Sequence, residues 1–283
     1  MRIGFIRVVE NTRLYGDTYV MWFAAPEFLR GATPGQFLML RCADQLAGAS
    51  ESPSAATLAD DPLLPRAMSY HRVRDGADGP EFAVLYDIVG RGTAWLARRE
   101  PGDAVFAWGP LGRGYSLPRQ GAGPNLLLAG GGIGIAPLLW LADEAVAKGR
   151  SVVLIDGARD ARGVFPAELV PSEVEVVVTT QDGSQGRQGL VTDVFLDYYG
   201  WSDQAFLCGP NPMFMALSEL LVKHDPSTGS GSRVRGRKPV QALLESPMGC
   251  GTGICYGCAI FDRRGAPRLV CKEGPRFELR EIW

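Results

Sequence analysis

Histidine is scarce in this chain, and neither sign of charge is in excess. Of the 283 residues only two are histidine, His71 and His224, and we expect both at the surface. The 29 lysines and arginines nearly balance the 31 aspartates and glutamates, for a net charge of −2. This balance gives no electrostatic reason to expect nucleic acid or an anionic membrane as a partner. The length allows two or three domains with cores of their own.

Signs of export and of membrane insertion are also missing. The start, Met1-Arg2-Ile3-Gly4, leads directly into a strand-like pattern without the architecture of a signal peptide. Residues 126–142 carry no charge, but glycines and Pro137 interrupt them and Asp143 follows at once. A buried strand, a glycine turn and a helix explain this run better than a membrane span. We therefore expect a soluble, cytoplasmic protein.

Cysteine is rare too, and four of the six cysteines lie in one segment near the end of the chain. Their spacing is C-x4-C-x2-C-x12-C, and with only Cys42 and Cys208 left over it favours a reducing compartment over a disulfide scaffold. The first three match the spacing by which plant-type ferredoxins bind a [2Fe–2S] cluster. The predicted metal ligands are Cys250, Cys255, Cys258 and Cys271.

Glycines are interspersed with these cysteines, at Gly249, Gly251, Gly253 and Gly257. A loop with so little side-chain bulk lets thiolates converge on two irons while backbone N–H groups turn towards the sulfides. A four-cysteine zinc site and a chance cluster are the alternatives. Zinc knuckles usually pair their ligands as two C-x2-C units, which the x4 gap fits poorly.

The first domain, residues 1–118, is predicted to be a small antiparallel β-barrel. Short branched or aromatic segments bounded by turn residues follow one another without helices between them. These segments are Ile3–Val9, Thr18–Phe23, Gln36–Arg41, Ala67–Val73 and Glu81–Val89. Residues 42–65, rich in alanine, serine, aspartate and proline, are expected to form a long mobile loop.

Two motifs in this domain are candidates for binding phosphate. On the strand Arg66-Ala67-Met68-Ser69, alternation puts Arg66 and Met68 on one face and Ala67 and Ser69 on the other. Further on, Gly92 permits close backbone approach, and Thr93 is a candidate N-cap for a helix through Arg99. A helix start after glycines suits a phosphate. Alone, each motif is weak, since most strand arginines are solvated and most capped helices bind nothing.

The second domain, residues 122–225, is predicted to be a doubly wound parallel α/β sheet, because strands and helices alternate. The expected strands are Asn125–Ala129, Ser151–Ile155, Glu173–Thr179 and Ala205–Cys208, and the expected helices span residues 138–148, 193–199 and 213–224. Ligands of such sheets bind at the carboxyl ends of the strands. There the turn G-G-G-x-G from Gly130 joins a strand to a helix, as a phosphate site requires.

The third segment, residues 226–283, is predicted to be a linker followed by the cluster domain. Residues 226–232 consist of proline, serine, threonine and glycine, which is typical of a flexible linker. The basic residues that follow, up to Lys238, indicate a solvated loop more than a patch for a partner. The chain is thus predicted to combine α+β and α/β domains.

Together, the motifs of the first domain resemble the flavin domain of the ferredoxin–NADP reductase superfamily. The resemblance implies FAD, with Arg66 on the pyrophosphate, Ser69 near the reactive ring edge, and Gly92 and Thr93 at the phosphates. Met68 stands where a tyrosine usually covers the ring. The remaining implied FAD residues are Ala67 and, on the neighbouring strand, Leu85, Tyr86 and Asp87.

The second domain resembles the nicotinamide domain of the same superfamily. The resemblance implies contacts to the nucleotide from Gly131, Gly132 and Gly134, from residues 156–159 and 180–184 at the ribose and adenine, and from Gly209. It places Cys208 beside the nicotinamide as a catalytic residue, although a lone thiol is more often a small buried hydrophobe. Arg159 would suit a 2′-phosphate, but no second basic residue stands beside it, so NAD is favoured over NADP.

The domain order and the cluster segment resemble the electron-transfer subunits of NAD-dependent, type B dihydroorotate dehydrogenases. A nicotinamide exchanges two electrons as hydride and a cluster exchanges one, so a flavin must stand between them. The chain shows no organic-substrate site of its own. The resemblance implies an FMN-containing catalytic subunit as partner, two copies of each chain, electron flow from FMN through [2Fe–2S] and FAD to NAD, and a place in pyrimidine biosynthesis.

Two other interpretations stay open at this point. A related NAD(P)H–flavin–cluster module would serve a hydrogenase, a glutamate-synthase-like enzyme or a ferredoxin. A non-redox binding protein would hold zinc in the cysteine loop. The sequence decides neither the partner nor the direction of electron flow.

Overall fold

The computed structural model describes residues 1–43, 62–119, 123–224 and 238–283. Most of the long loop expected at 42–65 and most of the linker at 226–238 lie outside these residues. In the described ranges, no helix is both long and apolar enough to cross a bilayer.

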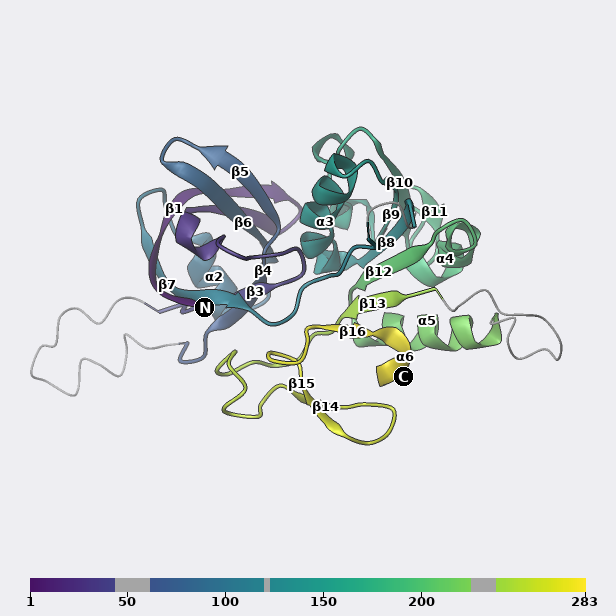
Figure 1. Ribbon diagram of the computed structural model, residues 1–283. Coiled ribbons are helices and arrows are strands. Elements are labelled where there is room, and N and C mark those ends of the chain that lie inside the picture. Colours follow the sequence, from purple (N-terminus) through teal and green to yellow (C-terminus); the bar gives the residue numbers. More distant parts are fainter. Residues whose placement is uncertain (44–61, 120–122, 225–237) are drawn as a thin grey trace, which may run out of the picture.

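The first domain is a curled, seven-stranded antiparallel sheet, as predicted (Figure 1). Its order is β4-β3-β7-β1-β2-β6-β5, and its concave face encloses an aromatic core that includes Phe23, Tyr70 and Phe82. The short helices η1 (Pro26–Phe28) and α2 (Arg91–Ala97) accompany it. The strands are β1 (Arg2–Tyr15), β2 (Thr18–Ala24), β3 (Phe37–Leu40), β4 (Arg66–Ser69), β5 (Arg72–Gly76), β6 (Gly79–Asp87) and β7 (Ala104–Leu111).

Three local predictions in this domain were wrong. The strand expected over residues 67–73 is two strands, because the chain turns at Tyr70 and His71. Thr93 is not an N-cap: α2 begins at Arg91, and the Thr93 hydroxyl accepts hydrogen bonds from the N–H groups of Val89 and Gly90. His71 is buried, with its Nδ1 2.8 Å from the carbonyl oxygen of Ala136, whereas His224 is exposed as expected.

The second sheet has the order β11-β10-β9-β8-β12-β13-β16 and is parallel except at its last strand. Helix α3 (Ala136–Ala147) covers the face towards the first domain, and α4 (Val191–Tyr199) and α5 (Asn211–Lys223) cover the other (Figure 1). The doubly wound prediction is confirmed. The strands are β8 (Asn125–Gly131), β9 (Ser151–Ala158), β10 (Val174–Thr180), β11 (Arg187–Gln188), β12 (Gln204–Cys208), β13 (Val240–Leu243) and β16 (Arg276–Glu278).

The boundary expected at residue 225 does not separate two units. Strands β13 and β16 belong to the C-terminal segment, yet they complete the second sheet because β13 pairs with β12. The rest of the segment forms the hairpin β14 (Ala259–Phe261) and β15 (Pro267–Leu269) and the short helix α6 (Leu279–Ile282). Short 3₁₀ turns, η2 (Gly132–Ile135), η3 (Ala161–Gly163) and η4 (Ala167–Leu169), follow β8 and β9.

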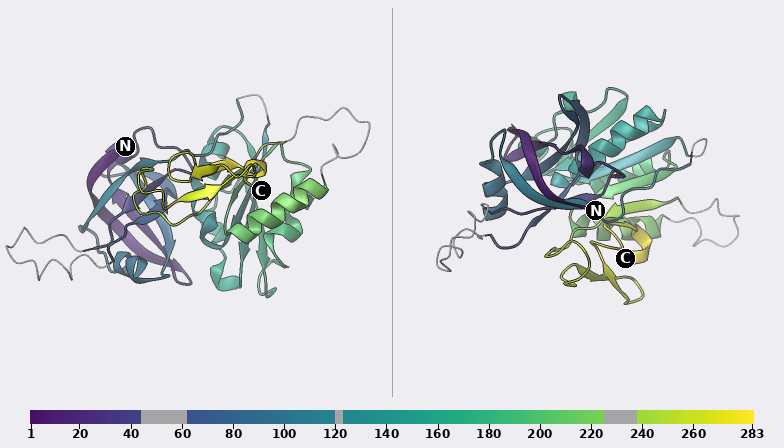
Figure 2. Two further views of the ribbon diagram at one scale, coloured as in Figure 1. Left: turned by 90° about the horizontal axis from the view of Figure 1, so that it is seen from below. Right: turned by 60° about the vertical axis from the view of Figure 1, so that its left-hand side comes forward.

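The cluster segment between β13 and β16 packs across both sheets (Figure 2). One continuous apolar core joins Met39 of the barrel, Leu207 of the second sheet, and Cys258 and Cys271 of the cluster segment. The indole Nε1 of Trp108 on β7 also donates a hydrogen bond of 3.0 Å to the carbonyl oxygen of Cys250. The three parts therefore meet around one point.

Candidate functional site

A central cavity of about 650 Å³ opens where the three parts meet. Its size falls in the usual range for sites of large organic ligands. The barrel contributes β3 and β4, the second sheet contributes the ends of β12 and β13, and the cluster segment closes one side. Its lining includes Phe37, Arg66, Ala67, Ser69, Cys208, Glu245 and Cys255.

Arg66 is held directly over the start of α2. A Cβ atom added to Gly92 would lie 2.6 Å from the Arg66 Nε, so the guanidinium in this position packs directly against the glycine. The Arg66 Nη1 also donates a 2.7 Å hydrogen bond to the carbonyl oxygen of Leu64. A fixed cation beside helical N–H groups favours an anion. The structure thus brings together two motifs that are far apart in the sequence.

Of the other residues expected around FAD, Ala67 and Ser69 line this cavity, whereas Met68, Leu85, Tyr86 and Asp87 do not. Met68 points into the barrel core and is 9% exposed, while its neighbours Ala67 and Ser69 face the cavity. Leu85 and Tyr86 are buried, and the Tyr86 hydroxyl donates to Oδ1 of Asn11. Asp87 accepts a 2.6 Å hydrogen bond from the Thr18 hydroxyl. These side chains support the wall from behind.

A second cavity, of about 470 Å³, lies at the carboxyl ends of the parallel strands. Of the residues expected to bind nucleotide, Gly131, Gly132, Arg159 and Gly209 line it. Gly134 does not line the cavity. It packs against the end of β12 instead, where a Cβ atom on it would collide with the carbonyl oxygen of Cys208. That glycine lets the turn after β8 pack against the end of β12.

Asp156 was expected to follow its strand, but it lies inside β9. It is 1% exposed, and its Oδ2 accepts a 2.8 Å hydrogen bond from the N–H group of Phe165. Burial raises its pKa to about 7. The contact to the cavity comes instead from the end of the strand, Gly157 to Arg159.

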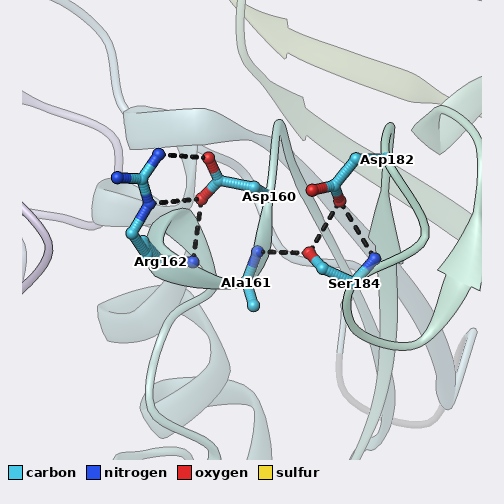
Figure 3. Close-up of polar contacts among 5 residues, drawn as sticks. All are labelled: Asp160, Ala161, Arg162, Asp182 and Ser184. Carbon is cyan, nitrogen blue, oxygen red and sulfur yellow. Dashed lines mark hydrogen bonds and ion pairs between the residues drawn. The ribbon is translucent and has the colours of Figure 1, made fainter.

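Two acidic loops are linked beside Arg159 (Figure 3). The Asp160 carboxylate accepts hydrogen bonds from the backbone N–H and the guanidinium of Arg162, at 2.8 Å for Nη2, and these bonds lower the pKa of Asp160. Asp182 accepts from the N–H and the hydroxyl of Ser184, whose oxygen accepts from the N–H of Ala161. Asp160 and Arg162 were not among the residues expected from the sequence to bind nucleotide.

Cys208 and Glu245 lie where the two cavities meet. Cys208 lines the first cavity, its neighbour Gly209 lines the second, and Glu245 lines both. Burial raises the pKa of both side chains, and that of the Cys208 thiol well above its usual value. The thiol is therefore neutral at physiological pH. Glu245 was not expected as a site residue, although its place just after the end of β13 is a signal that the sequence offers.

The four predicted ligand cysteines fall into two pairs. The sulfur atoms of Cys258 and Cys271 are 3.2 Å apart. In the other pair, Cys250 is in hydrogen-bonding contact with Cys255. Burial of the Cys250 thiol raises its pKa, but hydrogen bonds from Cys255 and Thr252 outweigh this effect and lower the pKa to about 5. Among the residues that the structure describes, no three acidic, histidine or cysteine side chains form a group that could hold a single ion.

This donor set fits a [2Fe–2S] cluster, which takes two thiolates for each iron. Backbone N–H groups of Thr252, Gly257 and Cys271 point at the sulfurs of Cys250, Cys255 and Cys258, each at 3.4 Å. Such bonds stabilise negative charge on cluster sulfur. Because Cys255 also lines the central cavity, the cluster site adjoins it.

Comparison with known proteins points to one family. A family model described as the iron–sulfur cluster binding domain of dihydroorotate dehydrogenase B matches residues 245–283. The chain is 36% identical to a protein of Desulforamulus reducens, covering 92% of this chain and 90% of the relative. It is 35% identical to one of Geobacillus thermodenitrificans, covering 97% and 96%. Both relatives are named dihydroorotate dehydrogenase B (NAD(+)), electron transfer subunit.

Solved structures share the fold. The structure of an NADH-dependent reduced ferredoxin-NADP oxidoreductase superimposes with a TM-score of 0.74 at 23% identity, covering 99% of this chain and 90% of that one. A ferredoxin NADP+ reductase from Neisseria gonorrhoeae, with bound FAD and NADP, gives 0.59 at 19% identity, covering 86% and 98%. The two-sheet arrangement is therefore common to flavin reductases.

Proposed function

The chain belongs to the electron-transfer subunits of NAD-dependent dihydroorotate dehydrogenase B, and we propose that it carries electrons between an FMN-containing catalytic subunit and NAD through its own [2Fe–2S] cluster and FAD. The observation that carries this proposal is the central cavity. Its wall joins Arg66 of the barrel, Cys208 of the second sheet and the cluster ligand Cys255. A flavin bound there would thus adjoin both the nicotinamide and the cluster.

FAD is assigned to the central cavity. Bound there, a flavin would accept electrons from the cluster one at a time and pass two of them to NAD as hydride. Arg66, held over Gly92, would pair with the pyrophosphate, and Thr93 fixes the backbone of that turn through its hydroxyl. Ala67 and Ser69 would contact the ring, while Met68, Leu85, Tyr86 and Asp87 hold the strands that carry them.

NAD is assigned to the second cavity, with its nicotinamide at Cys208 and Glu245. The neutral Cys208 thiol would fill the space beside the ring and exclude water without adding charge. Gly131, Gly132 and Gly209 leave backbone close to the phosphates, and Gly134 keeps the turn close to β12. Arg159 stands at the ribose end, but Asp160 binds the neighbouring Arg162, which favours NAD over NADP.

The four cysteines would hold the cluster, and the organic substrate would be oxidised on the partner subunit. We propose a complex of two copies of each chain that acts in pyrimidine biosynthesis in the cytoplasm. Dihydroorotate would be oxidised to orotate at FMN, and electrons would reach NAD in this chain.

Cys255→Ser tests the proposed route. The variant should keep NADH-to-dye activity, because that activity needs only FAD, and should lose NAD-dependent dihydroorotate oxidation with the catalytic subunit. Cys42→Ala, which alters a cysteine of the barrel core, is the control and should keep both activities. Full orotate formation by Cys255→Ser would show that electrons do not pass through the cluster. A purified wild-type protein without flavin and iron–sulfur absorbance would contradict the cofactor assignment.

A further inference from the structure

The outer face of the barrel carries an apolar row across β3, β7 and β1. Met39, Trp108 and Ile3 are successive partners in the pairing of these strands. The cluster loop, residues 249–257, covers the first of them: Met39 is fully buried, and a Cβ atom on Gly251 would lie 2.6 Å from its Cγ. Trp108, half-buried, binds the carbonyl oxygen of Cys250. The row therefore starts under the cluster loop.

Beyond Trp108 the same row is uncovered. Ile3 is 62% exposed and Phe5 is 55% exposed, although Phe5 packs edge-on against Phe106 with ring centres 5.1 Å apart. Met1 precedes them and is also exposed. Figures 1 and 2 show the N-terminus of the chain near the cluster segment. Exposed apolar groups of this size, joined in one row, are typical of an interaction surface.

The cluster loop itself presents two more large apolar side chains. Ile254 is 81% exposed and Tyr256 is 66% exposed, and they flank the ligand Cys255. Tyr256 has a φ of 59°, the one positive φ at a non-glycine position among the described residues. This left-handed backbone region is unusual for a residue with a Cβ atom, and such residues cluster at functional sites. Here it accompanies an aromatic ring in solvent between two cluster ligands.

We propose that these five side chains, Met1, Ile3, Phe5, Ile254 and Tyr256, form one docking surface for the FMN-containing catalytic subunit. The inference rests on the proposed function, in which electrons enter this chain at the cluster. Electron transfer weakens steeply with distance, so the partner must cover the cluster loop. A stable interface buries about 800 Å² on each partner. Nine loop residues offer less than that, and the adjoining face of β1 and β7 extends the surface with the aromatic composition of interface centres.

The test uses the complete chain with its cofactors and the catalytic subunit of the same organism. The double variant Ile3→Ser/Phe5→Ser removes apolar groups that lie in solvent, so the fold is retained. We expect its Kd for the catalytic subunit to rise at least about tenfold, as interface anchors do. NADH-to-dye activity and the visible spectrum should not change. Met215→Ser/Val222→Ser is the matched control, because these side chains are each 49% exposed and belong to α5, not to β1 or the cluster loop.

Unchanged affinity of Ile3→Ser/Phe5→Ser, or equal loss in the control, would overturn the docking surface alone. Absence of binding by the wild-type chain would overturn the proposed function, and the docking surface with it. Self-association of the wild-type chain that the double variant abolishes would assign the surface to a second copy instead. Rescue of NAD-dependent dihydroorotate oxidation at high concentrations of the catalytic subunit would support weakened docking over a broken electron route.

Discussion

Asp160 shows how a single carboxylate decides what a neighbouring cation can bind. It lies directly after Arg159, which lines the second cavity, and three donors of Arg162 are directed at it. A guanidinium held in this way offers few donors to a phosphate. The side chain of Asp160 also repels a phosphate beside that cavity. The proposed preference for NAD over NADP thus rests on an ion pair between two residues of one loop, Asp160 and Arg162.

Asp160→Ala should shift the preference towards NADPH. The change frees Arg162 beside Arg159, and two cations match a 2′-phosphate. We expect the ratio of kcat/KM for NADPH to that for NADH, measured with a dye acceptor, to rise about tenfold, the effect of one charge-assisted hydrogen bond. Adding Arg162→Ala should cancel the gain. Asp78→Ala, which breaks the exposed ion pair with Arg7 in the barrel, should leave the ratio unchanged. An unaltered ratio in Asp160→Ala would show that this ion pair does not determine the choice between NADH and NADPH.

At the scale of elements, the turn between β8 and α3 is fixed by contact with β12. The turn was predicted from its glycines, but the reason for Gly134 is visible only in the structure. Its Cα faces the carbonyl oxygen of Cys208, and Cys208 is itself held in register by Gly130 and Leu243 on either side. The backbone of β12 therefore cannot move away.

Gly134→Ala should weaken both stability and nucleotide binding. The added methyl group pushes the turn from β12, and such overpacking costs about 1–3 kcal/mol of the free energy of unfolding. The KM for NADH should rise in the dye assay because Gly131 and Gly132 move with the turn. Urea denaturation and steady-state kinetics measure the two effects. Gly200→Ala is the control: its φ of −57° and open surroundings accept a side chain. Wild-type values in both measurements would contradict the packing role of Gly134.

At the scale of the whole molecule, the two sheets are joined through buried polar and aromatic groups. Arg72 of β5 binds Asp143 of α3, with Nη2 2.5 Å from Oδ1. The ring of Phe165 packs edge-on against both Tyr15 and His71 of the barrel, each at 5.8 Å. Asp156 holds the backbone of Phe165 from inside the second sheet. A buried acid thus supports the contact between the domains.

Asp156 should make stability depend on pH. Its pKa is about 7 in the folded chain and near 4 when unfolded, so the folded state binds more protons between these values. The free energy of unfolding therefore falls as the pH rises from about 4 to about 7. Asp156→Asn keeps an acceptor for Phe165 and removes this loss. We expect its Tm relative to wild type to be several degrees more favourable at about pH 8 than at about pH 5.

Calorimetry at the two pH values measures this difference. Glu278, whose pKa burial also raises to about 7, contributes in the same range in both proteins and cancels in the comparison. A Tm difference between variant and wild type that is the same at both pH values would show that Asp156 does not titrate in this range.

The sequence alone predicted the two sheets and their order, because those features depend on local periodicity and turn residues. Alternating strands and helices indicated the parallel sheet, and the cysteine spacing indicated two irons. Prediction from the sequence failed where the surroundings of a residue are formed by segments distant in the sequence. His71 reads as a surface residue until α3 packs over it, and Asp156 reads as a site residue until η3 and Phe165 cover it.

Only the tertiary structure decided which residues share a site. Residues 66, 92, 208, 245 and 255 belong to four separate segments, and their meeting depends on how the barrel, the second sheet and the cluster segment pack. The pairing of β13 with β12 likewise assigned the C-terminal segment to the second sheet, which no local pattern near residue 225 shows. Residue spacing and secondary-structure propensity depend on a few neighbouring residues. Cavities, burial and pKa values depend on segments that are distant in the sequence and meet only in the folded chain.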